Sequence, residues 1–221
     1  MTTQRNGLYV HVSWLSKMMA GNYHCYWSPW FRARYTAYKK APSDFQLALW
    51  IIEHTQLLTE LIKERKGLIE TTYVENQNNF KLITPSGLVI SGKPDLITVD
   101  SDSRYKIYDA KTGQPRESDT IQVMLYMMCI SSIPSKYNGK EISGCLVYKN
   151  HGRKDIPSTA IGEEFRNSVS YFLNIIQSDT IPEKNPALME CRFCDIGEDD
   201  CPERHNPSEA QSDDNIPEIA L

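Results

Sequence analysis

The sequence predicts an α/β protein in which a mixed β-sheet is flanked by helices. In a long segment before residue 67, apolar residues recur at three- and four-residue spacing, which indicates a helix. From residue 69 the period changes to two, which is typical of strands. Further helices are predicted within and after the group of strands, and this order favours a mixed sheet.

Composition places the chain among ordinary globular proteins. Its 221 residues are enough for one sizeable core with a small appendage, and 40% are hydrophobic and 24% charged. The net charge of −4 excludes a general attraction to nucleic acid, so such contact needs a local basic patch. We find no signal pattern and no apolar run of membrane-spanning length, and therefore expect a cytoplasmic protein with no membrane partner. Its six cysteines are then expected to be thiols or metal ligands rather than disulfides.

The first part of the chain is expected to be helical. Residues 12–40 are aromatic and basic and predict short helices. Residues 44–66 predict a long helix, with Ser43 or Asp44 as its cap and Gly67 at its end. One face of this helix is apolar and carries a histidine; its members are Trp50, Ile51, His54, Leu57, Leu58 and Leu61.

Strands dominate the middle of the chain. Four are predicted, over residues 69–74, 80–83, 88–99 and 104–111, with turns at 76–79, 85–87 and 100–103. A helix over 118–130, a strand over 144–149 and a helix over 161–176 follow. The last two predicted segments are a cysteine-bearing end piece over 181–202 and a polar, acidic, disordered tail over 206–221.

Charged residues interrupt two of the apolar, strand-like runs. Asp95 follows Gly92-Lys93-Pro94, while Asp109 and Lys111 lie in the run that begins at Ile107. Burying a carboxylate or an ammonium group costs several kcal/mol unless something compensates. A divalent cation held by the two aspartates, with the lysine beside it, would supply that compensation.

Side chains alternate along a strand, so Asp109 and Lys111 share one face. The aspartate can bind a hard cation through oxygen, and the lysine can hold or deprotonate an attacking water or stabilise a developing phosphate charge. The competing interpretation is an Asp–Lys pair on a solvated edge strand. For a lone Asp-x-Lys tripeptide, that second interpretation is the better one.

Three other features favour a site. Asp95 lies on the preceding strand, within reach across a hairpin that turns at residues 100–103. His54 can supply a nitrogen ligand, although a histidine satisfied within the core is the favoured interpretation when His54 is considered alone. Gln122 and Tyr126 are four residues apart on a predicted helix and project together, but they also fit an ordinary, partly buried helix face.

With these features in this order, the chain resembles the PD-(D/E)XK nuclease superfamily in its RecB-like branch. Pro94-Asp95 and Asp109-x-Lys111 match the signature. The Gln122-x-x-x-Tyr126 element and a histidine on an early helix are typical of the RecB-like branch. The resemblance implies a restriction-endonuclease-like core that hydrolyses phosphodiester bonds in DNA.

The resemblance also implies a role for each residue. Mg²⁺ or Mn²⁺ would be bound by His54, Asp95, Asp109 and the carbonyl of Ala110. Lys111 would assist the nucleophilic water. Gln122 and Tyr126 would orient the lysine or the DNA backbone.

Three clustered cysteines near the C-terminus need a separate explanation. They form the run Cys191-x2-Cys194-x6-Cys201, followed by a proline, and cluster-binding runs often end in that way. A fourth ligand is required, and Cys25 is the natural choice because it lies outside any periodic core pattern. The two remaining cysteines fall in a predicted helix and a predicted strand, where buried small hydrophobes are more common; they are Cys129 and Cys145.

RecB-like nucleases with an iron–sulfur cluster share this layout of one cysteine before the nuclease motifs and three after them. The chain looks especially like the CRISPR-associated Cas-four family and the nuclease domain of AddB. In the Cas-four family the motif often reads Asp-Tyr-Lys-Thr-Gly, where this chain has Asp109-Ala110-Lys111-Thr112-Gly113. The resemblance implies one nuclease domain over residues 1–205, with a cluster region at Cys25 and 188–202. Four thiolates also suit zinc, but the layout favours a [4Fe–4S] cluster.

The resemblance implies an exonuclease that acts on single-stranded DNA or DNA ends, with CRISPR-adaptation (antiviral) or recombination proteins as partners. The aromatic and basic residues of 27–40 suit stacking on unpaired bases, although a helix with an aromatic core face is an equally good interpretation. The alternative functions are a DNA-end-binding module with dormant cleavage and a zinc-stabilised protein with another hydrolytic role.

Overall fold

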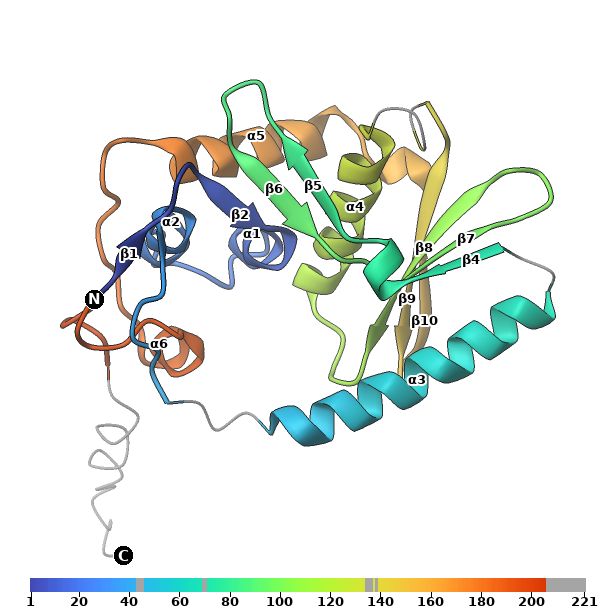
Figure 1. Ribbon diagram of the computed structural model, residues 1–221, viewed down its shortest axis with the longest axis horizontal. Helices are drawn as coiled ribbons and strands as arrows, with labels where there is room; N and C mark the ends of the chain where they lie inside the picture. Colours follow the sequence, from blue (N-terminus) through green and yellow to red (C-terminus); the bar gives the residue numbers. More distant parts are fainter. Residues whose placement is uncertain (43–45, 69–70, 134–136, 138, 206–221) are drawn as a thin grey trace, which may run out of the picture.

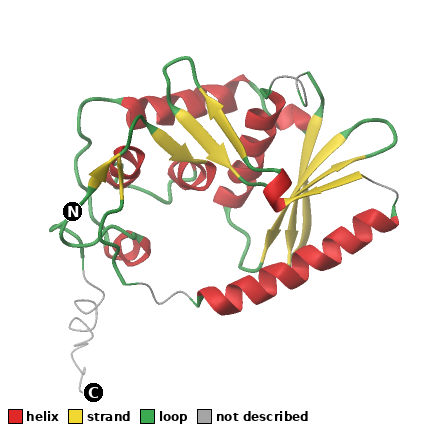
Figure 2. Cartoon of the chain, viewed as in Figure 1, coloured by secondary structure: helices red, strands yellow, loops and turns green. Residues whose placement is uncertain are grey.

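The computed structural model describes the whole chain except residues 43–45, 69–70, 134–136, 138 and 206–221. The cap predicted at Ser43 or Asp44 and the predicted tail therefore lie outside the described residues. The described strands form three β-sheets, of five, three and two strands. Figures 1 and 2 show helices packed around them, which confirms a mixed α/β architecture. No helix in the described part of the chain is long and apolar enough to cross a membrane.

The larger sheet is mixed and has five strands. In spatial order they are β10 (Gly152–Ile156), β9 (Ile142–Tyr148), β8 (Tyr105–Lys111), β7 (Leu96–Val99) and β4 (Thr71–Val74). β8 and β9 are parallel, and the other neighbours are antiparallel. β10 was not predicted because its first four residues are exposed and mostly polar or charged, without an apolar alternation. Charged residues of this kind protect an edge strand from pairing with another chain.

The smaller sheet corrects one prediction. It contains β2 (Tyr9–His11), β6 (Val89–Gly92) and β5 (Phe80–Ile83), while β1 (Thr3–Gln4) pairs only with β3 (Tyr35–Thr36). The single strand predicted over 88–99 is wrong, because it divides into β6 and β7, which belong to different sheets. Pro94 lies between them and has no N–H to donate to a ladder. The amide of Asn78 holds this crossing, donating to the carbonyl of Pro94 at 3.3 Å.

Two helices sandwich the larger sheet (Figure 1). Helix α4 (Glu117–Ser131) packs on one face in the main core, where Ile107 of β8 meets it. Helix α3 (Leu47–Gly67) covers the other face, where Tyr108 joins a second apolar cluster with Leu58 and Leu61. The remaining helices are α1 (Val12–Met19), α2 (Trp27–Arg34), α5 (Glu163–Gln177) and α6 (Leu188–Phe193), with 3₁₀ turns η1 (Glu75–Gln77) and η2 (Ser158–Ala160).

The apolar face predicted for α3 is only partly correct. His54, Leu58 and Leu61 are buried, but Trp50 and Ile51 are 39% and 48% exposed. Figure 1 shows the reason, since the first turns of α3 extend past the end of the sheet. Helical periodicity identifies the face of a helix but not how much of that face finds a partner.

The aromatic segment 27–40 serves mainly as core, so the prediction that it stacks on bases is wrong for its helical part. Trp27, Trp30 and Phe31 are buried, and the rings of Trp27 and Phe31 stack at 4.8 Å. Arg32 is buried as well, with its Nε 2.8 Å from Oδ1 of Asp195. The alternative, a helix with an aromatic core face and a solvated basic face, is therefore correct for the aromatic face but wrong for Arg32.

Candidate functional site

The end of β8 places an acid and a base side by side. Asp109 is only 2% exposed, and its Oδ2 lies 2.6 Å from Nζ of Lys111. Nζ also donates to Oε1 of Gln122 at 3.3 Å and lies 4.0 Å from Oδ1 of Asp119, an acidic residue that the sequence did not single out. The ammonium group is thus held between two carboxylates and an amide, as a buried cation requires.

Asp95, just before β7, is joined to two other segments. Its Oδ2 accepts a hydrogen bond from the backbone N–H of Ala110 at 2.7 Å and lies 3.1 Å from Nε2 of His54. The ring of Trp50, one turn earlier on α3, stacks on the imidazole with centroids 5.0 Å apart. These contacts fix the orientation of the histidine ring against the acidic side chain.

The two polar residues of α4 link both halves of this arrangement. Nε2 of Gln122 donates to the hydroxyl of Tyr126 at 3.0 Å and to Oδ1 of Asp109 at 3.4 Å. The hydroxyl of Tyr126 in turn donates to the carbonyl of Lys93 at 3.4 Å, beside the segment that carries Asp95. The structure thus brings together all the side chains that the sequence singled out for the central site.

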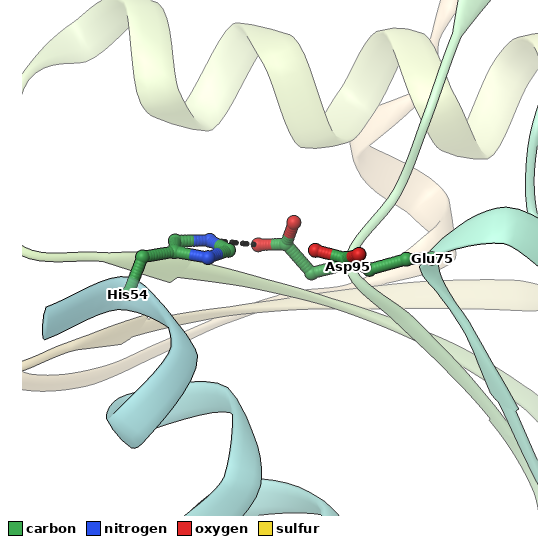
Figure 3. Close-up of side chains that lie close together, drawn as sticks. All are labelled: His54, Glu75 and Asp95. Atoms are coloured by element: carbon green, nitrogen blue, oxygen red, sulfur yellow. Dashed lines mark hydrogen bonds and ion pairs between the residues drawn. The ribbon is translucent and has the colours of Figure 1, made fainter. Parts of the chain in front are cut away.

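Glu75 is a further member of the site that sequence reasoning missed. One ligand atom each from His54, Glu75 and Asp95 lie within 4.8 Å of one another, the spacing of a potential metal site (Figure 3). The Glu75 carboxylate is 3.4 Å from Nζ of Lys93, and its backbone φ of 27° is uncommon for a residue other than glycine. No sequence signal marks this residue, because it lies in a turn and belongs to no periodic pattern.

The electrostatics of the site favour a bound cation. Burial raises the pKa of Asp109 to about 6, although the charge of Lys111 opposes this. A hydrogen bond to Asp95 raises the pKa of His54, despite partial burial. Burial lowers the pKa of Lys111, but the charge of Asp109 outweighs it and the net pKa is raised. A divalent cation would offset the cost of the clustered carboxylates.

The donor set fits such a cation. It offers carboxylate oxygens and one imidazole, ligands that suit Mg²⁺ and Mn²⁺. Oδ2 of Asp109 is buried and forms an ion pair with the ammonium of Lys111 at 2.6 Å. A metal ion bound at this carboxylate would share it with Lys111.

The four cysteines singled out by the sequence line one small pocket; they are Cys25, Cys191, Cys194 and Cys201. Burial raises the pKa of the Cys25 and Cys201 thiols. The carboxylate of Glu190 joins the two ends of the chain there, because its Oε1 accepts from the backbone N–H groups of His24 at 2.8 Å and Cys25 at 3.2 Å. The other two cysteines are buried in the apolar clusters, as predicted; they are Cys129 and Cys145.

Comparison with known proteins places this geometry in a family. No curated protein matches the chain significantly. The crystal structure of SSO0001 matches it with a TM-score of 0.51 and 17% identity, over 91% of this chain and 89% of that one, which shows a shared fold. The model of the PD-(D/E)XK nuclease superfamily matches residues 28–198, well over half of the sequence. The chain therefore belongs to the PD-(D/E)XK nuclease superfamily.

Proposed function

We propose that this protein is a metal-dependent deoxyribonuclease whose active site is the cluster around Asp109. The observation that carries the proposal is the convergence of acidic, imidazole and ammonium groups from separate elements. Asp95 lies 3.1 Å from His54, and Asp109 lies 2.6 Å from Lys111, while the backbone of Ala110 joins the two pairs. A structural ion pair alone has no need of the imidazole and the second carboxylate.

Each ligand group has a proposed place. His54, Asp95 and Asp109 would hold the cation with the carbonyl of Ala110. Glu75, which lies close to His54 and Asp95, would add a further carboxylate. Bound there, Mg²⁺ or Mn²⁺ supplies an activated water and neutralises charge on the phosphate.

The protein's own groups do the rest. The ammonium of Lys111 holds the attacking water or the phosphate oxygen that gains charge. Gln122 keeps that ammonium in place through its 3.3 Å hydrogen bond, and Tyr126 keeps Gln122 in place. These two residues are positioning residues for Lys111.

We infer that the cysteine pocket holds a [4Fe–4S] cluster. Four thiolates that line one pocket suit either zinc or an iron–sulfur cluster. The cysteine run that ends in Cys201-Pro202, with one cysteine before the nuclease motifs, supports the cluster.

The finer assignment is an exonuclease that trims single-stranded DNA or frayed ends, in a CRISPR-adaptation or recombination setting. Support for it comes from the layout of one cysteine before the nuclease motifs and three after them. A DNA-end-binding module with dormant cleavage would not need the metal-binding side chains, so their presence argues against this alternative.

A cleavage assay decides between the two. Wild type is expected to degrade labelled single-stranded DNA with Mn²⁺, and Asp109→Ala is expected to be inactive while it keeps its secondary structure. Equal, negligible cleavage by both proteins, with DNA binding retained, would favour the binding module.

A further inference from the structure

A large groove opens beside the site and has no role in the chemistry described so far. It has a volume of about 1020 Å³, at the upper end of the range for ligand sites. The first turns of α3 form one wall, α6 forms another, and α1 and the loop that joins β8 to α4 complete it (Figure 1). We call it the entry groove.

The walls of the entry groove expose large apolar side chains. Leu49 and Trp50 of α3 are 51% and 39% exposed, and Met189 and Phe193 of α6 are 62% and 73% exposed. Exposed apolar patches of this kind mark interaction sites. Two of the four are aromatic, one on each wall, which suits flat, apolar partners such as nucleic-acid bases.

Two cations of the groove form no ion pair with any described residue, whereas two of its three carboxylates pair with cations outside it. Within the described residues, neither Lys17 nor Arg116 forms an ion pair. Glu53 forms an ion pair with Lys149 at 2.8 Å, and Asp195 forms one with Arg32 at 2.8 Å. Oε1 of Glu190 accepts from backbone N–H groups, although its Oε2 has no hydrogen-bond partner among the described residues. The groove therefore contains two cations, Lys17 and Arg116, that its acidic residues do not pair with.

The positive charge of Arg116 also acts on Lys17. Burial lowers the pKa of Lys17, and the positive charges of Arg32, Arg116 and Lys111 lower it further, although the charge of Asp195 opposes this. Because like charges repel, cations that lie this close together favour the binding of an anion between them.

The groove adjoins the proposed active site. Thr112, which lines it, follows Lys111 directly, and the indole of Trp50 lies on the imidazole of His54. A chain lying in the groove would reach the cation site at this end. At the other end, α6 leads into the segment that carries the cysteines.

We propose that the entry groove holds the single DNA strand that leads to the cleaved bond. Lys17 and Arg116 bind its phosphates, and Trp50 and Phe193 contact its bases. The inference rests on the proposed function for its substrate, but it assigns residues that the chemistry does not use. A duplex has no free base faces to offer to these walls, so the groove selects an unpaired strand.

The test measures binding without cleavage. Fluorescence anisotropy with labelled oligothymidylate, in EDTA, is recorded over a series of salt concentrations for the full chain. For single strands the slope of log affinity against log salt changes by about 0.7 for each phosphate contact. The Lys17→Ala/Arg116→Ala double variant is therefore expected to bind more weakly, with a slope shallower by about 1.4.

Two controls separate this effect from a loss of net charge. Lys81 and Lys140 are exposed and lie outside the groove, so Lys81→Ala/Lys140→Ala should keep the wild-type slope. Lys17→Arg/Arg116→Lys keeps both charges and should restore binding. Equal slopes for the groove variant and the surface control would overturn the proposal.

The apolar wall is tested at Phe193, which is exposed and adds little to the core. Stacking on one base contributes about 1–3 kcal/mol, so Phe193→Leu should weaken binding about 5- to 150-fold while Phe193→Tyr retains it. A blunt duplex of the same length should compete poorly; equal competition would overturn the selection of a single strand.

Failure of this inference differs from failure of the proposed function. If wild type binds oligothymidylate through the groove but never cleaves it with Mn²⁺, the proposed nuclease function is rejected and the DNA-binding role of the groove is supported. If wild type cleaves, and the groove variants bind and cleave as well as wild type, the DNA-binding role of the groove is rejected and the nuclease function is supported.

Discussion

A buried carboxylate with a raised pKa dominates the site at the scale of single residues. Asp109 is nearly inaccessible, and its nearest positive group is the ammonium of Lys111. The pKa of Asp109 nevertheless rises to about 6, because burial outweighs this attraction. In the metal-free protein Asp109 therefore loses its proton near pH 6 and not near its ordinary pKa of 3.8, and two experiments follow from it.

The first is the pH dependence of stability in EDTA. The folded pKa of Asp109, about 6, lies above its ordinary value of 3.8, so between these pH values the folded state binds more protons than the unfolded state. Asp109 thus destabilises the fold progressively as pH rises from about 4 to about 6. Relative to Asp109→Asn, the melting temperature of wild type is expected to fall over that window and then level off. A constant difference from pH 4 to pH 7 would contradict it.

The second experiment concerns Lys111. Lys111→Met should lower Mn²⁺-dependent cleavage by at least about 100-fold, because it removes the group proposed to hold the attacking water or the developing charge. Folding should change little, since Asp109 can take up a proton when its partner is lost. Cleavage rate and melting temperature are measured together.

Lys106→Met is the matched control, because Lys106 lies on the same strand but points to the other face and pairs with Asp155 at 2.7 Å. It should leave cleavage unchanged. A large loss of stability in Lys111→Met, with cleavage retained, would remove Lys111 from the chemistry.

At the scale of elements, the crossing between β6 and β7 positions the site. Pro94 lies after the end of β6, and Asp95 lies just before the start of β7. The carboxylate of Asp95 is therefore placed where the chain passes from one sheet to the other. The apolar residues on both sides of this crossing look like one strand, and the sequence pattern could not separate them. The pairing of β7 with β8 across residues 100–103 was predictable, because turn residues and alternation agree there.

Helix α4 carries Gln122 and Tyr126, the proposed positioning residues, and its contact with β9 depends on a glycine. A Cβ on Gly144 would lie 2.4 Å from Cγ1 of Val123 and 2.9 Å from Sδ of Met127. Gly144→Ala should therefore push α4 away and destabilise the protein by about 1–3 kcal/mol, as overpacking does. Urea denaturation measures the change.

Two further variants make the result specific. Gly67→Ala, where an added methyl meets nothing within 4 Å, should be close to neutral. Adding Val123→Ala to Gly144→Ala should recover part of the loss, because it removes the closest contact. Equal stability of Gly144→Ala and wild type would show that α4 moves without cost.

For the whole molecule, the sequence predicted the central site better than its surroundings. Asp109 and Lys111 were recoverable because strand alternation fixes their face, and Gln122 because helix spacing aligns it with Tyr126. Glu75 and the entry groove were not, because both depend on how distant segments meet. The aromatic residues near Trp30 fit either a core or a DNA surface, and only their packing against the C-terminal segment decides it.

The same long-range packing gives the last prediction. Cys25 and the segment from Cys191 to Cys201 meet at one pocket, so a metal group there would tie together chain segments more than 160 residues apart. Metal binding by such a site is coupled to folding. Cys191→Ser, purified without oxygen, should contain far less iron than wild type and melt at a lower temperature. Cys129→Ala is the control, because Cys129 is a buried thiol outside the pocket. This variant should contain as much iron as wild type, even if its melting temperature changes. Zinc without iron in wild type would reject the cluster and keep the thiol site, whereas unchanged iron in Cys191→Ser would show that this thiol is not a ligand.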